Sequence, residues 1–184
     1  MHIEYRVAQV TDVSALEELI PLSARGLRGS YYTPEQTEGA IGAVFGVDTQ
    51  LIKDGTYFVA LADSKLVGCG GWSKRKTLYG GDKARIGEDL LRDPKSEPAM
   101  IRAFFVHPAF ARRGIGSEIM RRSVAAAHEA GFRDIEIIAT LPGEPLYAAC
   151  GYLVVERFEI LLENGASLPV VRMRQANRPN TAPL

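Results

Sequence analysis

The chain has 184 residues and a mass of 20.1 kDa, and 46% of its residues are apolar, which suits one domain with one hydrophobic core. Lysine plus arginine balance aspartate plus glutamate at 22 each, so no overall basic field exists to hold nucleic acid or an anionic membrane. Cys69 and Cys150 are too few for a disulfide framework, and the N-terminus lacks the apolar core of a signal peptide. We therefore expect a cytoplasmic protein with one domain over residues 1–175, without nucleic acid or membrane as a partner.

The N-terminal segment predicts a strand followed by helices. Residues 3–8 alternate apolar and polar side chains, as in a half-buried strand. Thr11 and Asp12 then offer an N-cap to a helix with an apolar stripe. Pro34 is a good first residue of a further helix, so one or two helices are expected within residues 34–53.

The middle of the chain predicts a hairpin, a long loop and a buried strand. Two runs rich in β-forming residues, 56–63 and 65–75, are separated by a short polar turn and indicate a β-hairpin. Residues 76–99 read as a loop of functional length, with one helical turn expected around Ile86, Leu90 and Leu91. The nearly continuous apolar run 100–106 is typical of a strand covered on both faces.

The C-terminal part predicts one long helix and further strands. Apolar residues within 114–130 fall on a helical stripe, and Gly131 is placed to end that helix. Asn164-Gly165 is a strong hairpin signal, and the polar, proline-containing tail 176–184 is expected to be disordered. The other expected elements are a strand at 134–140, a short helix at 145–150, and strands at 152–162 and 168–174.

A turn suited to binding an anion joins the buried strand to the long helix. Gly114 and Gly116 let the backbone approach a ligand closely, and the N–H groups that begin a helix attract negative charge. Arg112, Arg113 and Ser117 add charge and hydrogen-bond donors. The pattern is neither the dinucleotide-binding fingerprint, which needs a third glycine, nor a P-loop. A pyrophosphate is the expected guest.

Two spaced motifs resemble those of the GNAT acetyltransferase superfamily. Its motif A, V-x-P-x-x-[QR]-x-x-G-x-[GA], matches from Val106 to Gly116, except that Ala111 stands at the [QR] position. Its motif B, L-Y-x-x-x-G-[FY], matches Leu146 to Tyr152. The similarity extends over about residues 3–174.

This resemblance implies an α/β fold with a mixed sheet of about seven strands in the order β-α-α-β-β-β-α-β-α-β-β, and a V-shaped splay between the fourth and fifth strands. It also implies acetyl-CoA as cosubstrate and no metal. The residues expected to bind acetyl-CoA are Phe104, Phe105, Val106, Arg112, Arg113, Gly114, Ile115, Gly116, Ser117 and Thr140.

The implied chemistry is direct attack of an amine on the thioester in a ternary complex. Tyr147 matches the position whose hydroxyl protonates the departing CoA thiolate, although an aromatic residue on a short helix also suits core packing. Glu97, before the fourth strand, is the expected general base, with a solvated surface carboxylate as the other reading. Cys150 has no histidine partner that would make it a nucleophile.

The acceptor is expected to be a small-molecule primary amine. Trp72, Tyr31 and Tyr32 are candidates to wall its site, and Asp82 is a candidate to recognise a cationic amine, with Glu88 and Asp89 as weaker ones. A non-catalytic acyl-CoA-binding or sensor module on the same fold is the alternative function. A homodimer is expected through the exposed edge of the closing hairpin.

Overall fold

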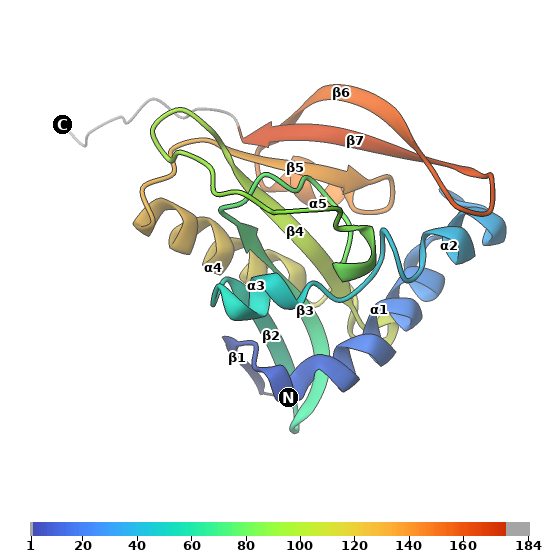
Figure 1. Cartoon of the computed structure of the whole chain (residues 1–184). Coiled ribbons are helices and arrows are strands. Elements are labelled where there is room, and N and C mark those ends of the chain that lie inside the picture. Colours follow the sequence, from blue (N-terminus) through green and yellow to red (C-terminus); the bar gives the residue numbers. More distant parts are fainter. Residues whose placement is uncertain (1, 176–184) are drawn as a thin grey trace.

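The fold, given by a computed structural model that describes residues 2–175, is a seven-stranded sheet with helices on both faces (Figure 1). The strands are β1 (Ile3–Val7), β2 (Tyr57–Ala62), β3 (Lys65–Ser73), β4 (Ala99–Val106), β5 (Ile135–Thr140), β6 (Tyr152–Leu161) and β7 (Ser167–Gln175). The helices are α1 (Val13–Leu27), α2 (Pro34–Ala40), α3 (Thr49–Lys53), α4 (Ile115–Glu129) and α5 (Glu144–Ala149). Short 3-10 turns are η1 (Val10–Asp12), η2 (Asp82–Ala84) and η3 (Pro108–Phe110).

The strand order is β1-β2-β3-β4-β5-β7-β6, which Figure 1 shows running from β1 at the bottom to β6 at the top. All neighbouring strands are antiparallel except β4 and β5, which run parallel. The expected mixed sheet of seven strands is confirmed. The expectation for the tail at 176–184 lies outside the described residues.

Local signals account for the turns and helix starts. Asp63 and Ser64 both have positive φ, 48° and 65°, which is the backbone that a two-residue hairpin turn requires. Thr33 and Gln36 form a reciprocal capping box before α2, with N···O distances of 3.1 and 3.0 Å. These contacts lie within a few residues of one another, so they depend on the local sequence.

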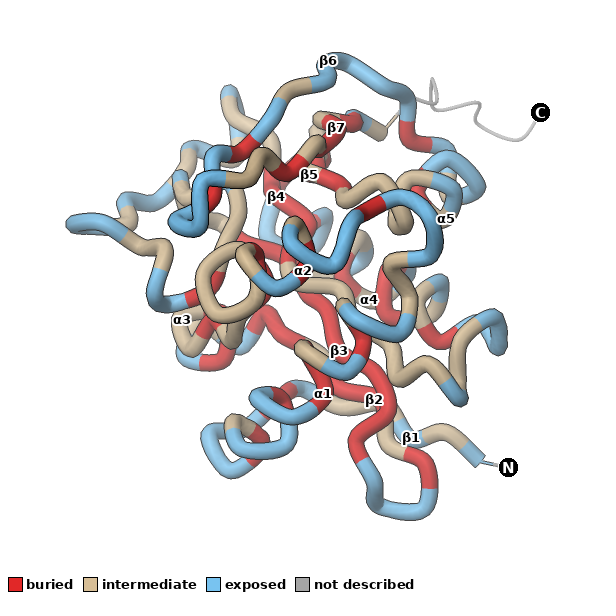
Figure 2. The backbone as a smooth tube through the Cα atoms, turned by 90° about the vertical axis from the view of Figure 1, so that its right-hand side faces the viewer, coloured by how far each residue is buried: buried red, intermediate tan, exposed pale blue. Residues whose placement is uncertain are grey.

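The core lies on both faces of the central strands. Val59 belongs to the cluster of α1, whereas its neighbour Ala60 packs with Ile115 of α4 on the other face. A Cβ at Gly68 would lie 2.6 Å from Ile115 Cγ2, so glycine allows α4 to approach β3. Figure 2 shows the buried backbone concentrated in β2, β3 and β4, while most of β6 is exposed.

The long loop before β4 differs from the expectation. The predicted helical turn around Ile86, Leu90 and Leu91 is absent, and these side chains are 97%, 53% and 58% exposed. The loop instead contains η2 and is attached to the domain by arginine and aspartate side chains. With no apolar surface covering this patch, the driving force for a helical turn is missing.

Within residues 2–175, no helix is long and apolar enough to cross a membrane.

Candidate active site

A cavity of about 750 Å³ lies where β4 and β5 separate. The two strands pair only from Ala99 to Ile101 and then diverge, so β4 presents residues 102–106 without a partner on that side. Around this gap stand the N-terminal loop of α4, the helix α5, the end of α1 and the segment 78–80. The splay therefore creates a site with open backbone groups at its centre.

The divergence of β4 coincides with a bulge at Ala103. Gly71 pairs with Arg102 and Cys69 with Phe105, so two β4 residues face the single residue Gly70. Ala103 has φ of 56°, which is unfavourable for a residue with a Cβ. The conformation is held by Tyr57, whose hydroxyl donates to the Ala103 carbonyl at 2.9 Å. The bulge turns the following backbone toward the cavity.

The residues after the bulge line the cavity. Phe104 stacks edge-on against Tyr147 with ring centres 6.2 Å apart, and its ring lies over Gly70, where a Cβ would approach to 2.6 Å. The Val106 N–H is engaged by α1, since it donates to Ser23 Oγ at 3.1 Å. Phe104 has no ladder partner in either neighbouring strand. Its N–H is thus a better candidate than that of Val106 to bind a ligand.

The loop that leads into α4, residues 111–117, forms one end of the cavity, and we call it the anion loop. Arg112 and Gly114 have φ of 62° and 80°, and the Gly114 backbone caps the helix. The first N–H groups of α4 have no acceptor within the helix, and Gly114 to Ser117 line the cavity. Such N–H groups and the helix dipole favour an anion. Arg113 does not line the cavity; its guanidinium lies 5.4 Å from the Phe110 ring centre.

Tyr147 stands on α5 at the cavity wall. Its side chain is 6% exposed and packs between Phe104 and Tyr152. Burial, followed by the charges of Tyr152 and Cys150, raises the pKa of the Tyr147 hydroxyl well above its ordinary value. Among the described residues this hydroxyl has no hydrogen-bond partner. It is therefore a protonated donor available to a ligand.

Tyr31, Tyr32 and Thr140 also line the cavity. The Tyr32 hydroxyl accepts from Leu141 N at 2.9 Å and donates to Pro169 O at 2.6 Å. Burial raises its pKa to about 12. This tyrosine holds the loop after β5 to β7, and its ring remains at the cavity.

Glu97 does not lie at the cavity. It precedes β4, at the opposite end of the strand from the anion loop, and accepts from Asp93 N at 2.8 Å. This hydrogen bond, with the charges of Lys76 and Arg92, lowers the pKa of Glu97. The carboxylate thus organises its own loop and lies outside the cavity lining, which does not favour it as the general base.

Asp82 and Trp72 are also placed elsewhere. The Asp82 carboxylate accepts from Thr49 N at 3.1 Å and pairs with Arg85 at 3.3 Å, so it joins its loop to α3. Trp72 is 4% exposed and packs edge-on against Phe132, with ring centres 5.8 Å apart. Neither side chain lines the cavity. Both faces of β3 are covered, and Trp72 belongs to the core cluster that also contains Phe132 and Ile135.

Sequence reasoning missed a buried ion pair beneath the cavity. Arg102 of β4 is 3% exposed, and its guanidinium pairs with Asp48 at 2.9 Å. It also donates to Thr77 O at 2.8 Å and Gly80 O at 2.6 Å. The available signal was one ionisable residue within the apolar run 100–106, since such a residue is buried only with a partner.

Residues 2–175 contain no group of three or more His, Cys, Asp or Glu side chains arranged to hold a metal ion.

Comparison with solved structures identifies the same fold in other proteins. A GCN5-related N-acetyltransferase from Rhodopseudomonas palustris is 17% identical, with a TM-score of 0.71 over 96% of this chain and 97% of that one. The PaiA N-acetyltransferase from Thermoplasma acidophilum, in complex with coenzyme A, is 14% identical, with a TM-score of 0.64 over 96% and 100%. A GNAT family acetyltransferase from Brucella melitensis, in complex with acetyl-CoA, is 17% identical, with a TM-score of 0.56 over 98% and 92%.

A search of curated proteins found no match. The sequence model of the acetyltransferase (GNAT) family, however, matches residues 18–152, which contain the anion loop, the splayed strands and Tyr147. The chain therefore belongs to the acetyltransferase (GNAT) family and is an acyltransferase of the GNAT type.

Proposed function

We propose that this protein transfers the acetyl group of acetyl-CoA to a primary amine of a small molecule. The observation that carries the proposal is the single cavity that joins the N–H groups at the start of α4 to the hydroxyl of Tyr147. An anion-binding end and a proton donor on one wall suit a thioester donor with a phosphate-bearing carrier. The acetyl thioester supplies an activated acyl group.

Different residues of the cavity would bind different parts of acetyl-CoA. The pyrophosphate would lie at the backbone N–H groups of 112–117, with Arg112 adding charge. Thr140 and the backbone of residues 104–106, on the side of β4 that lacks a strand partner, would contact the pantetheine chain. The N–H of Phe104 would donate to the thioester oxygen and stabilise the charge that develops there.

The transfer then proceeds in one direct displacement. The neutral amine nitrogen attacks the carbonyl carbon, a C–N bond forms and the C–S bond breaks. The Tyr147 hydroxyl gives its proton to the departing sulfur and regains one from water. Because Glu97 lies away from the cavity, solvent water rather than this carboxylate takes the proton that the amine loses. The products are an N-acetylated amine and CoA.

A thiol-release assay with acetyl-CoA and a panel of primary amines tests the proposal, with mass spectrometry of the acetylated product. We expect amine-dependent release and an increase in melting temperature with acetyl-CoA. A melting shift without release for any amine would instead favour a non-catalytic acyl-CoA-binding module.

Localisation and assembly stay predictions. Both cysteines are free thiols, as a reducing cytoplasm would keep them. The edge strand β6 exposes Leu153, Val154 and Leu161, which suits pairing of two copies into a homodimer. A molar mass from light scattering near that of one chain would contradict the homodimer.

A further inference from the structure

The acceptor end of the cavity is apolar and aromatic. By acceptor end we mean the lining residues that come from the end of α1, from the segment 44–45 and from the segment 78–80. It excludes the lining residues of the splayed strands, α4 and α5. Phe45 packs edge-on against Phe105 of β4, with ring centres 6.0 Å apart. Tyr31 and Tyr79 add two further rings. Such walls favour an acceptor with an apolar body over a strongly hydrated one.

The charged side chains that line the cavity are all arginines. Within residues 2–175, the lining contains no Asp, Glu, His or Lys side chain. Its charged side chains are Arg28, Arg102 and Arg112. A polyamine or another multiply charged cation would therefore meet like charges without a compensating carboxylate. This replaces the expectation that Asp82 recognises a cationic amine.

Two carboxylates that contact residues of the cavity wall and its adjoining loop, those of Asp48 and Asp89, already have partners. Asp48 pairs with both Arg102 and Arg85, and it caps α3 through Gln50 N at 3.1 Å. Asp89 accepts from Thr77 N at 2.9 Å. Turning these groups toward a substrate would break the contacts that hold the wall of the cavity in place.

Arg28 differs from the other two arginines. Arg102 is neutralised by Asp48, and Arg112 belongs to the anion loop. Arg28 follows the last residue of α1, is half-buried, and its guanidinium has no hydrogen bond or salt bridge within the described chain. The charge of Arg28 acts on the carboxylate of Glu38, but that carboxylate is hydrogen-bonded by Arg25 at 2.7 and 2.8 Å.

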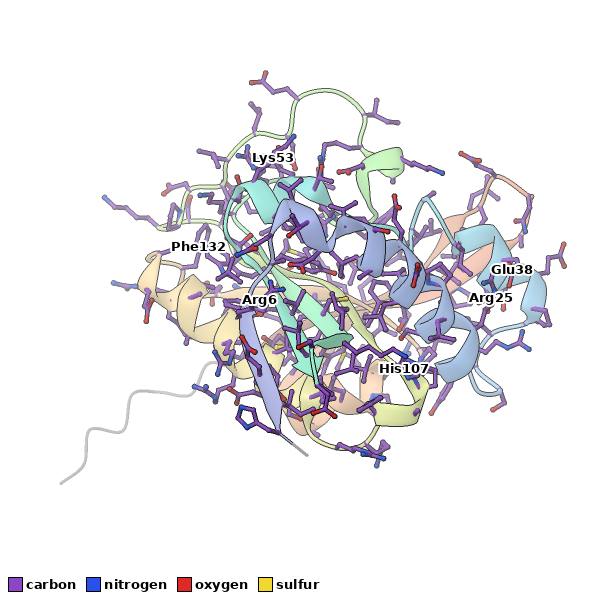
Figure 3. The ribbon with its side chains drawn as sticks, turned by 90° about the horizontal axis from the view of Figure 1, so that it is seen from below. Arg6, Arg25, Glu38, Lys53, His107 and Phe132 are labelled. Atoms are coloured by element: carbon purple, nitrogen blue, oxygen red, sulfur yellow. The ribbon has the colours of Figure 1, made fainter. Side chains whose placement is uncertain are left out.

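Figure 3 shows Arg25 of α1 and Glu38 of α2, which form an exposed ion pair, next to each other. Glu38 thus makes its hydrogen bonds with Arg25, and no hydrogen bond joins it to the Arg28 guanidinium. A half-buried guanidinium at a cavity wall is well suited to bind a carboxylate through two parallel hydrogen bonds.

We infer that the acceptor is a primary amine that also carries a carboxylate and an apolar or aromatic body, as an aromatic α-amino acid does. Arg28 binds the carboxylate, and Phe45, Tyr79 and Tyr31 contact the body. The amine then faces the splay between β4 and β5. This inference rests on the proposed acetyl transfer and names the substrate class of the same cavity.

The test compares phenylalanine, phenethylamine and spermidine as acceptors in the thiol-release assay. All three probes have a primary amine. Phenethylamine lacks the carboxylate of phenylalanine, and spermidine lacks both the carboxylate and the aromatic ring and carries additional positive charge. We expect kcat/KM for phenylalanine to exceed that of the other two by about 10- to 100-fold, the range of a charge-assisted hydrogen-bond pair. Spermidine as the best acceptor would overturn the inference while leaving acetyl transfer intact.

Variants assign the effect to the arginine. Arg28→Gln should raise KM for phenylalanine about 10-fold or more without changing KM for acetyl-CoA or the rate with phenethylamine. Arg133→Gln, an exposed arginine outside the cavity, is the control and should change neither constant. An increase confined to KM for acetyl-CoA would place Arg28 on the donor side and refute the inference.

Calorimetry of phenylalanine binding to the CoA-loaded protein gives a readout that does not need turnover. Binding that is lost in Arg28→Gln supports the inference even where release is too slow to measure. Equal binding by both proteins contradicts it. Absence of thiol release with every amine would refute the proposed function. The calorimetric comparison of wild type and Arg28→Gln would still decide whether Arg28 binds the carboxylate.

Discussion

Burial sets the chemistry of the Tyr147 hydroxyl. The side chain is enclosed by Phe104 and Tyr152, and the ionised form loses solvation there, which raises its pKa. The phenol therefore remains protonated through the neutral range. In this neutral form it can donate a hydrogen bond to a thiolate that forms in the cavity and stabilise the departing sulfur.

Tyr147→Phe should lower kcat by about 100-fold, within the range of general acid catalysis, with little change in KM for acetyl-CoA. Tyr152→Phe is the matched control, because its hydroxyl contacts Met120 Sδ at 3.7 Å and does not line the cavity. Steady-state kinetics of both variants provide the measurement. Equal losses in the two variants would indicate packing instead of proton donation.

The pH dependence follows from the same burial. Since the pKa of Tyr147 lies above its ordinary value of about 10, the donor form stays complete as pH rises to that value. We expect no decrease in kcat from tyrosine ionisation between neutral pH and about pH 10. A decrease in kcat below pH 10 that occurs in the wild type and is absent in Tyr147→Phe would contradict this prediction.

The bulge of β4 is held at the Ala103 carbonyl by the Tyr57 hydroxyl at 2.9 Å and by the weaker donor Cys69 Sγ at 3.9 Å. Tyr57→Phe removes the stronger donor and should destabilise the fold by about 1–3 kcal/mol. It should also lower kcat, because the Phe104 N–H loses its fixed direction. Ala103→Gly removes the strain of the positive φ and should stabilise by about 1 kcal/mol.

Denaturant unfolding and kinetics check both variants. A Tyr57→Phe protein with reduced stability and unchanged kcat would show that the bulge is rigid without this contact.

The start of α4 is the second element that the function depends on. Ser117→Glu places a carboxylate at the expected pyrophosphate site and should weaken acetyl-CoA binding at least about 10-fold, whereas Ser117→Ala should change it little. Ser117 is exposed, so neither substitution disturbs the core. Gly116 is a poorer position, because a Cβ there would lie 3.0 Å from Leu146 Cδ2. Calorimetry that finds equal affinities for the two variants would refute the loop assignment.

At the scale of the whole molecule, the ion pair between Asp48 and Arg102 ties three distant segments together. It connects the start of α3, the strand β4 and the loop carbonyls of Thr77 and Gly80. Burial lowers the pKa of Arg102, and the charge of Asp48 opposes this change. The position of the acceptor wall relative to the splay therefore depends on a contact in the core.

Arg102→Met should destabilise the protein by about 3–5 kcal/mol, because it leaves the carboxylate of Asp48 buried with one partner fewer. Arg25→Met is the comparison, since its ion pair with Glu38 is exposed to solvent and should contribute little to the free energy of unfolding. Urea unfolding of both variants measures the difference. Similar small losses would show that Arg85 alone neutralises Asp48.

The sequence by itself determined the elements that depend on near neighbours. The hairpin turn at Asp63 and Ser64 and the helix starts at Pro34 and Gly114 all follow from contacts or backbone preferences within a few residues. The spacing of the two motifs led to the family, and with it to the fold, the anion loop and the position of Tyr147 at the cavity.

Only the tertiary structure decided which polar side chains face the cavity. Glu97 and Asp82 looked suited to the site, but hydrogen bonds within their own loops and to α3 hold them elsewhere. Arg102 and Asp48 are 54 residues apart in sequence, so no spacing rule could pair them. Their positions depend on long-range packing of strands and loops, and the charge of the acceptor end follows from that packing.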